Sequence, residues 1–127
     1  MRFTRLNGFF AGLIGVLMVS TPVLAHHGYA AYDMVTIMSV KATIVSMVLE
    51  NPHSTITFDV KDANGNIEHW FSESDNPRNM RRSGLTPDTL KPGDQVTVYY
   101  HPSKNGEHVV VLTKVEFTDG RVLKARD

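Results

Sequence analysis

The chain has 127 residues and carries 13 Lys and Arg against 13 Asp and Glu, so its formal net charge is zero. Its longest basic run is Arg81-Arg82, which excludes the strong positive footprint of a protein that binds phosphate backbones, and we expect no nucleic-acid partner. There is no cysteine, which excludes disulfides and a thioether-linked lipid anchor, whereas six histidines make metal binding a candidate function.

Residues 1–25 are predicted to be a cleavable export signal. Arg2 and Arg5 precede an apolar stretch, and a small-residue cleavage site ends at Ala25. A lone membrane anchor is the competing interpretation, but a spanning helix needs about 20 apolar residues and this stretch has roughly a dozen. We therefore expect a periplasmic or secreted protein of residues 26–127 that forms one domain, keeps no stable membrane anchor, and carries 11 Lys and Arg against 13 Asp and Glu.

The remaining chain divides into short strands separated by turns. Residues 35–49 are apolar and often β-branched, and residues 54–60 alternate between apolar and polar side chains, as in a half-buried strand. Asn64-Gly65 predicts a hairpin turn, because both of its positions accept a positive φ angle, and residues 67–73 return as the next strand.

A short helix is predicted over residues 76–84. Asn76 is suited to cap it, Pro77 fits its first turn, and Gly84 would end it. The remaining predicted strands are residues 95–100, 109–117 and 121–123.

This order predicts a mainly β fold, a small five-stranded antiparallel barrel like the oligonucleotide/oligosaccharide-binding (OB) fold, with one short helix between strands three and four. A small antiparallel sandwich or an open roll would give the same order of elements. The barrel is favoured because the first strand is long enough to bend and serve both halves of the sheet.

If the turn at Asn64-Gly65 contains two residues, positions whose numbers sum to 129 pair across the hairpin. His69 then lies opposite Val60, on the apolar side of its strand, where a satisfied core histidine is the expected role. Trp70 lies on the other face, near Asp59, with its ring partly exposed.

Several short motifs together resemble a known family. They are His26-His27-Gly28, Asn51-Pro52-His53, Trp70 followed by Glu73, Gly84, and Lys91-Pro92-Gly93-Asp94. The set is similar to a family of small exported bacterial proteins described only as a domain of unknown function, number 6152. The resemblance covers nearly the whole chain after the signal and implies an exported β fold, without an assigned activity. Leu49-Glu50 stands where the family usually has a tryptophan ahead of the Asn-Pro-His motif.

Cleavage after Ala25 would give the chain an N-terminal histidine. The α-amine of His26 and the Nδ1 atom of its own ring can close a six-membered chelate on a metal, and His27 adds a second imidazole. Such an all-nitrogen ligand set suits Cu(II), so copper is the expected metal. His53, which follows Pro52 in a turn, is the third predicted ligand. The alternative is that this end of the chain is polar and disordered.

In the predicted register, Glu73 and Asp75 share one end of the hairpin with His53, where carboxylates would orient its ring. The alternative role for His53 is a hydrogen bond to the turn backbone. His101 and His108 flank a later turn and are expected to be solvent-exposed without a metal role.

Known catalytic motifs are absent from the sequence, so we expect a binding protein and not an enzyme. The alternative to metal binding is a module of the cell envelope that presents Trp70, Tyr99, Tyr100 and the loop at Pro52 to a protein, a glycan or a small ligand. A copper oxygenase with a two-histidine brace, in which His53 would be essential, ranks third because no substrate surface is evident.

Overall fold

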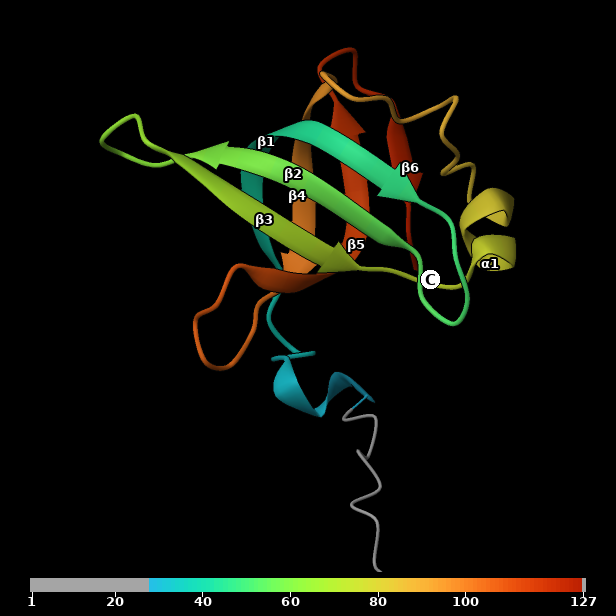
Figure 1. The fold of residues 1–127 in the computed structure, drawn as a ribbon, viewed down its shortest axis with the longest axis horizontal. Helices are drawn as coiled ribbons and strands as arrows, with labels where there is room; N and C mark the ends of the chain where they lie inside the picture. Colours follow the sequence, from blue (N-terminus) through green and yellow to red (C-terminus); the bar gives the residue numbers. More distant parts are fainter. Residues whose placement is uncertain (1–27, 127) are drawn as a thin grey trace, which may run out of the picture.

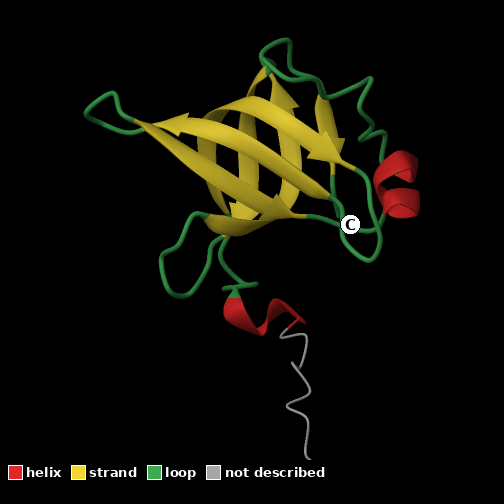
Figure 2. Ribbon diagram, in the orientation of Figure 1, coloured by secondary structure: helices red, strands yellow, loops and turns green. Residues whose placement is uncertain are grey.

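The computed structural model describes residues 28–126, which form a closed barrel of five strands with one short helix and a sixth strand attached outside the barrel (Figures 1 and 2). In chain order the elements are η1 (Gly28–Ala31), β1 (Met38–Val48), β2 (Thr55–Lys61), β3 (Ile67–Glu73), α1 (Pro77–Arg82), β4 (Gln95–His101), β5 (Val109–Phe117) and β6 (Val122–Lys124). The prediction of a mainly β, OB-like barrel with its helix between strands three and four is confirmed.

The barrel is mixed, so the prediction of a purely antiparallel barrel is wrong at one seam. Strand β1 pairs antiparallel with both β2 and β4, and the pairs β2–β3 and β4–β5 are also antiparallel. Phe71–Glu73 of β3 and Val109–Val111 of β5 pair in parallel and close the ring. Direction cannot alternate around a closed ring with an odd number of strands, so one neighbouring pair of the five must be parallel.

The long first strand serves both halves of the barrel, as its length predicted. Its first part, from Met38 to Thr43, pairs with β4, and its second part, from Thr43 to Val48, pairs with β2. The register shifts between Ile44 and Ser46, which is an irregularity of the kind that bends a strand.

The β2–β3 hairpin has a longer loop than predicted, which shifts the register by one position. The ladder ends at Lys61 opposite Ile67, so residues 62–66 form the loop, and paired positions sum to 128 instead of 129. Asp62 organises this loop, because its Oδ1 atom accepts hydrogen bonds from the backbone N–H groups of Asn64 and Asn66, both at 2.8 Å. The side-chain amide of Asn66 also donates to Asp62, and this bond, followed by the backbone bonds, lowers the pKa of the Asp62 carboxyl. The one-position shift exchanges the two faces of β3.

The core lies inside the barrel and continues beneath α1. Phe58 and Ile44 are fully or almost fully buried in its centre, and Met80 of α1 packs into the same cluster. Asn76 caps the helix as predicted, since its side-chain oxygen accepts from the N–H group of Asn79 at 3.0 Å. Within residues 28–126, no helix is long and apolar enough to cross a membrane.

Candidate functional site

The segment that follows the predicted cleavage site is docked at one end of the barrel. The N–H group of Asp33 donates to the carbonyl of Pro102 at 2.9 Å, and the N–H group of Lys104 donates to the carbonyl of Ala31 at 2.9 Å. In Figure 1, η1 lies in blue close to the orange loop between β4 and β5. These contacts hold the start of the described chain against the β4–β5 loop.

Tyr32 anchors this segment. Its side chain is only 8% exposed, and the residue forms an isolated β-bridge with Ser103 of the β4–β5 loop. Burial, and next the charge of Glu73, raise the pKa of the Tyr32 hydroxyl, which indicates that the end of β3 lies near the docked segment. Glu73 pairs with Thr55, two positions after His53. The docked segment therefore lies toward the end of the barrel at which β3 ends and β2 begins.

Of the three predicted copper ligands, only His53 lies in the described part of the chain. It is half-buried two positions before the start of β2, whereas His26 and His27 lie outside the described residues. Asp75 accepts a hydrogen bond from the side chain of Asn79 at 2.8 Å, so its carboxylate holds the beginning of α1. Among residues 28–126, no three His, Cys, Asp or Glu side chains lie close enough together to hold a metal ion.

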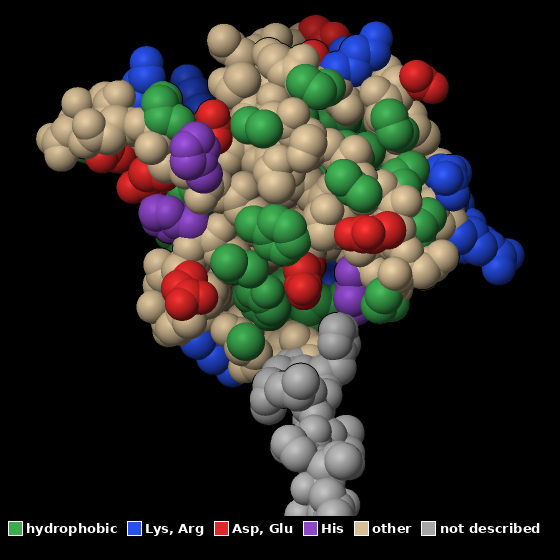
Figure 3. All heavy atoms as spheres, viewed as in Figure 1, with side chains coloured by type: hydrophobic (Ala, Val, Ile, Leu, Met, Phe, Trp, Pro, Cys, Tyr) green, Lys and Arg blue, Asp and Glu red, His purple; other side chains and the backbone are tan. Residues whose placement is uncertain are grey.

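His69 lies on the surface, so the prediction that it is a core histidine is wrong. Its side chain is 84% exposed, and its Nδ1 atom lies 2.6 Å from Oδ1 of Asp59 on the outer face of the hairpin. The register explains the difference, because His69 pairs with Asp59 and not with Val60. Figure 3 shows histidine side chains exposed beside acidic ones on the face drawn there.

The exchange of faces turns Trp70 toward the interior, where it joins an aromatic cluster. The indole ring contacts Phe58, with ring centroids 5.9 Å apart, and meets Tyr100 edge-on at 5.3 Å. His108 stacks flat on it, at 4.5 Å and an interplanar angle of 8°. Glu68 accepts the indole N–H at 3.1 Å and lies 3.7 Å from Nε2 of His108.

This cluster was missed in the sequence because the contacts that build it are long-range. His108 is exposed, as predicted, but it immediately precedes the part of β5 that pairs with β3, and its carbonyl accepts from the N–H group of Phe71 at 2.9 Å. No local pattern relates position 108 to Trp70. His101, predicted to be exposed, is half-buried, and its Nδ1 atom lies 2.7 Å from the carbonyl oxygen of Thr36.

A cleft of about 210 Å³ opens beside Trp70 at the mouth of the barrel. It lies where β1 and β5 begin and β4 ends, and the β4–β5 loop forms its rim. The lining residues are Met38, Trp70, Tyr100, Pro102, Ser103, Gly106, Glu107, His108 and Val110. Barrel mouths with apolar walls and a few polar groups are frequent sites for small ligands.

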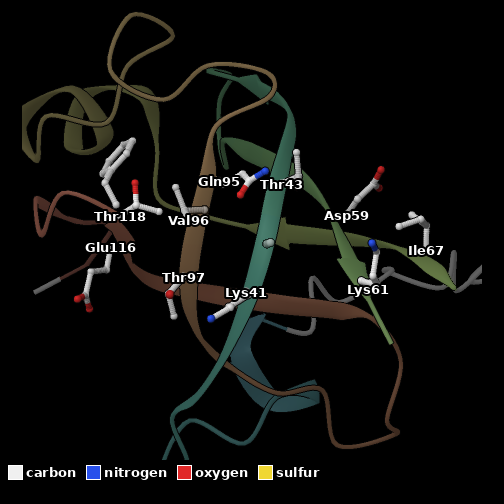
Figure 4. Close-up of a pocket in the computed structure, with 12 residues that line it drawn as sticks. Lys41, Thr43, Asp59, Lys61, Ile67, Gln95, Val96, Thr97, Glu116 and Thr118 are labelled. Carbon is white, nitrogen blue, oxygen red and sulfur yellow. The ribbon is translucent and has the colours of Figure 1, made fainter. Parts of the chain in front are cut away.

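A second, larger hollow of about 490 Å³ lies across β1 and its neighbouring strands (Figure 4). Figure 4 shows that the polar ends of Lys41, Lys61 and Glu116 point in different directions, so these groups do not converge on one ligand position. The two carboxylates are already engaged, since Asp59 bonds His69 and Glu116 accepts from the hydroxyl of Tyr99 at 3.0 Å. The hydroxyl of Tyr99, which the alternative to metal binding assigned to a partner or ligand, is therefore bonded within the protein to Glu116.

The protein is a small β-barrel of the OB-like class, as its strand order, its parallel seam and the helix between β3 and β4 show. An N-terminal segment is docked on the barrel, and an aromatic cleft opens at one mouth. The chain belongs to the family of unknown function DUF6152, whose family model matches residues 14–112. This match confirms the family expected from the sequence motifs. Among curated proteins, none matches this chain.

The hydroxyl groups of Tyr32, Tyr99 and Tyr100 are expected to ionise above pH 10 in the folded protein. Burial raises the pKa of Tyr32 and Tyr100 from 10.0, and the hydrogen bond to Glu116 raises that of Tyr99. A pKa that is higher in the folded state gives stability that is present below pH 10 and is lost as the pH rises through the folded value. Ultraviolet titration of the native protein should therefore lag behind a titration in urea, and coincident curves would contradict this expectation.

Proposed function

We propose that the protein is an exported copper-binding protein whose site forms at the N-terminus created by signal cleavage. His26 supplies its α-amine and ring nitrogen, His27 adds an imidazole, and His53 completes an all-nitrogen set suited to Cu(II). The observation that supports this proposal is the docking of residues 28–33 on the barrel, where the charge of Glu73 acts on Tyr32 and Glu73 pairs with Thr55, two positions after His53.

Chain geometry limits where the two leading histidines can lie. His27 is joined directly to Gly28, the first residue of η1, and two residues extend at most about 7 Å. Both histidines therefore remain near the docked segment. A short tether of this kind reduces the entropy that is lost when His53 joins a chelate formed by the N-terminus.

The first measurement is the mass and N-terminal residue of the exported protein, which we expect to begin at His26. Electron paramagnetic resonance with one equivalent of Cu(II) then tests the chelate. We expect a nitrogen-rich tetragonal spectrum and tight binding, both of which are lost when Gly-Ser is placed ahead of His26. A spectrum that is unchanged by the extension would refute the proposal.

Two single substitutions test the contribution of the barrel. His53→Ala is expected to weaken copper binding and alter the spectrum, because one nitrogen ligand is removed. His69→Ala is the matched control, since His69 lies on the outer face of the hairpin, bonded to Asp59, and its loss should leave the spectrum unchanged. Equal effects of the two variants would exclude His53 as a ligand.

A further inference from the structure

We infer that the aromatic cleft at the barrel mouth is a second binding site, for a small organic cation of the quaternary-ammonium type. Three observations support this inference: the aromatic lining of the cleft, the hydroxyl group that Tyr100 brings to it, and the charge of the rim. The site is independent of the copper ligands proposed above.

The lining has the chemistry that holds organic cations. Trp70 and Tyr100 meet at an interplanar angle of 75°, so a ligand in the corner between them contacts two rings, and Met38 adds a polarisable apolar wall. Cations are attracted to the negative faces of aromatic rings, most strongly to tryptophan. The hydrogen bond from the indole N–H of Trp70 to the Glu68 carboxylate makes this ring richer in electrons.

The side chain of His108 covers one face of the indole ring of Trp70. Its imidazole stacks on Trp70 at 4.5 Å, and its side chain is 43% exposed. This face of the indole is therefore covered by an exposed side chain and not by the core. Because His108 stands at the end of the β4–β5 loop, a ligand can reach the ring by displacing it.

Tyr100 supplies a polar group to the cleft. The residue is only 4% exposed and lines the cleft, and burial raises the pKa of its hydroxyl, which therefore stays protonated and can donate a hydrogen bond to a ligand. A ligand that accepts this hydrogen bond gains affinity and orientation in the cleft. The ligand is therefore expected to carry a hydroxyl or carbonyl group beside its cationic centre.

Charge and volume narrow the class of ligand further. The charged residue of the cleft lining is Glu107, and no Lys or Arg of the described chain is part of this lining. Lys104 on the same loop donates to the carbonyl of Ala30 at 2.8 Å, away from the cleft. The volume of about 210 Å³ equals that of about seven water molecules, which suits a small ammonium compound.

The test uses choline as the cationic probe and 3,3-dimethylbutanol as its neutral isostere. Trp70 is the only tryptophan of the chain, so its fluorescence reports on the cleft without further labelling. In buffer with a chelator, which removes any effect of copper, choline should change the emission saturably and bind about tenfold more tightly than the isostere. Equal affinities, or no saturable change with either compound, would overturn the proposal.

Two matched variants test whether the local charge of Glu107 contributes to choline binding, or only the net charge of the protein. Glu107→Gln is expected to weaken choline binding about threefold and to leave binding of the neutral isostere unchanged. Glu116→Gln makes the same change of charge on the outer face, away from the cleft, and should leave both affinities unchanged. If the two variants weaken choline binding equally, Glu107 does not act at the site.

A quaternary ammonium group can come from a free cation or from a lipid headgroup. Sedimentation with phosphatidylcholine vesicles distinguishes the two sources. Co-sedimentation that choline displaces assigns the headgroup, whereas choline binding without co-sedimentation assigns a free cation.

Discussion

Replacing Phe58 with alanine is expected to lower the free energy of unfolding by about 4 kcal/mol, because it leaves a large cavity where the surrounding strands cannot collapse. Phe58 is fully buried. On β2 it pairs with Ile44 on one side and with Trp70 on the other, and its ring contacts the indole. The substitution therefore removes contacts from three neighbouring strands at once.

Urea unfolding monitored by circular dichroism measures this loss. Phe71→Ala is the matched control, because Phe71 is also an aromatic residue of the hairpin but is 36% exposed on the outer face. It should cost about 1 kcal/mol. The comparison also tests the register, since the register that sums to 129 would place Phe71 inside, opposite Phe58. Similar losses for the two variants would contradict the register of the structure.

Tyr32→Ala is expected to release the N-terminal segment from the barrel and to lower the free energy of unfolding by about 3 kcal/mol. Tyr32 is 92% buried, and its backbone is bridged to Ser103 of the β4–β5 loop. Without the ring, the hydrogen bonds from Asp33 to Pro102 and from Lys104 to Ala31 lose the packing that protects them from water.

Amide hydrogen exchange measures this release directly. The N–H groups of Asp33 and Lys104 should exchange faster in Tyr32→Ala, whereas those in the centre of β2 should change only by the global loss of stability. Tyr32→Phe keeps the ring and should preserve their protection. Under the proposed function, Tyr32→Ala also removes His53 from the copper site. Unchanged exchange at Asp33 would show that Tyr32 does not anchor the segment.

Most of the secondary structure could be predicted, because it depends on residues that are close together in the chain. Turn signals followed by strand-forming residues predicted the strands at residues 67–73 and 109–117 with the bounds they have in the structure. Asn76 and Pro77 predicted the beginning of the helix for the same reason, since a cap bonds to backbone groups only a few positions away.

The hairpin register was mispredicted because two local signals compete in one loop. Asn64-Gly65 favours a two-residue turn, but the Asp62 carboxylate accepts from two backbone N–H groups and stabilises the five-residue loop. Since side chains alternate with a period of two, this single shift moved His69 outward and Trp70 inward.

The sequence by itself determined the strands, the capped helix, the OB-like order of elements and the family, because each rests on local patterns or on motifs. Only the tertiary structure decided which face of β3 lies inside, where the parallel seam closes the ring, and which side chains surround Trp70. The physical reason is that these features arise from pairing between strands far apart in the chain, above all β3 with β5, and local sequence carries no information about such partners.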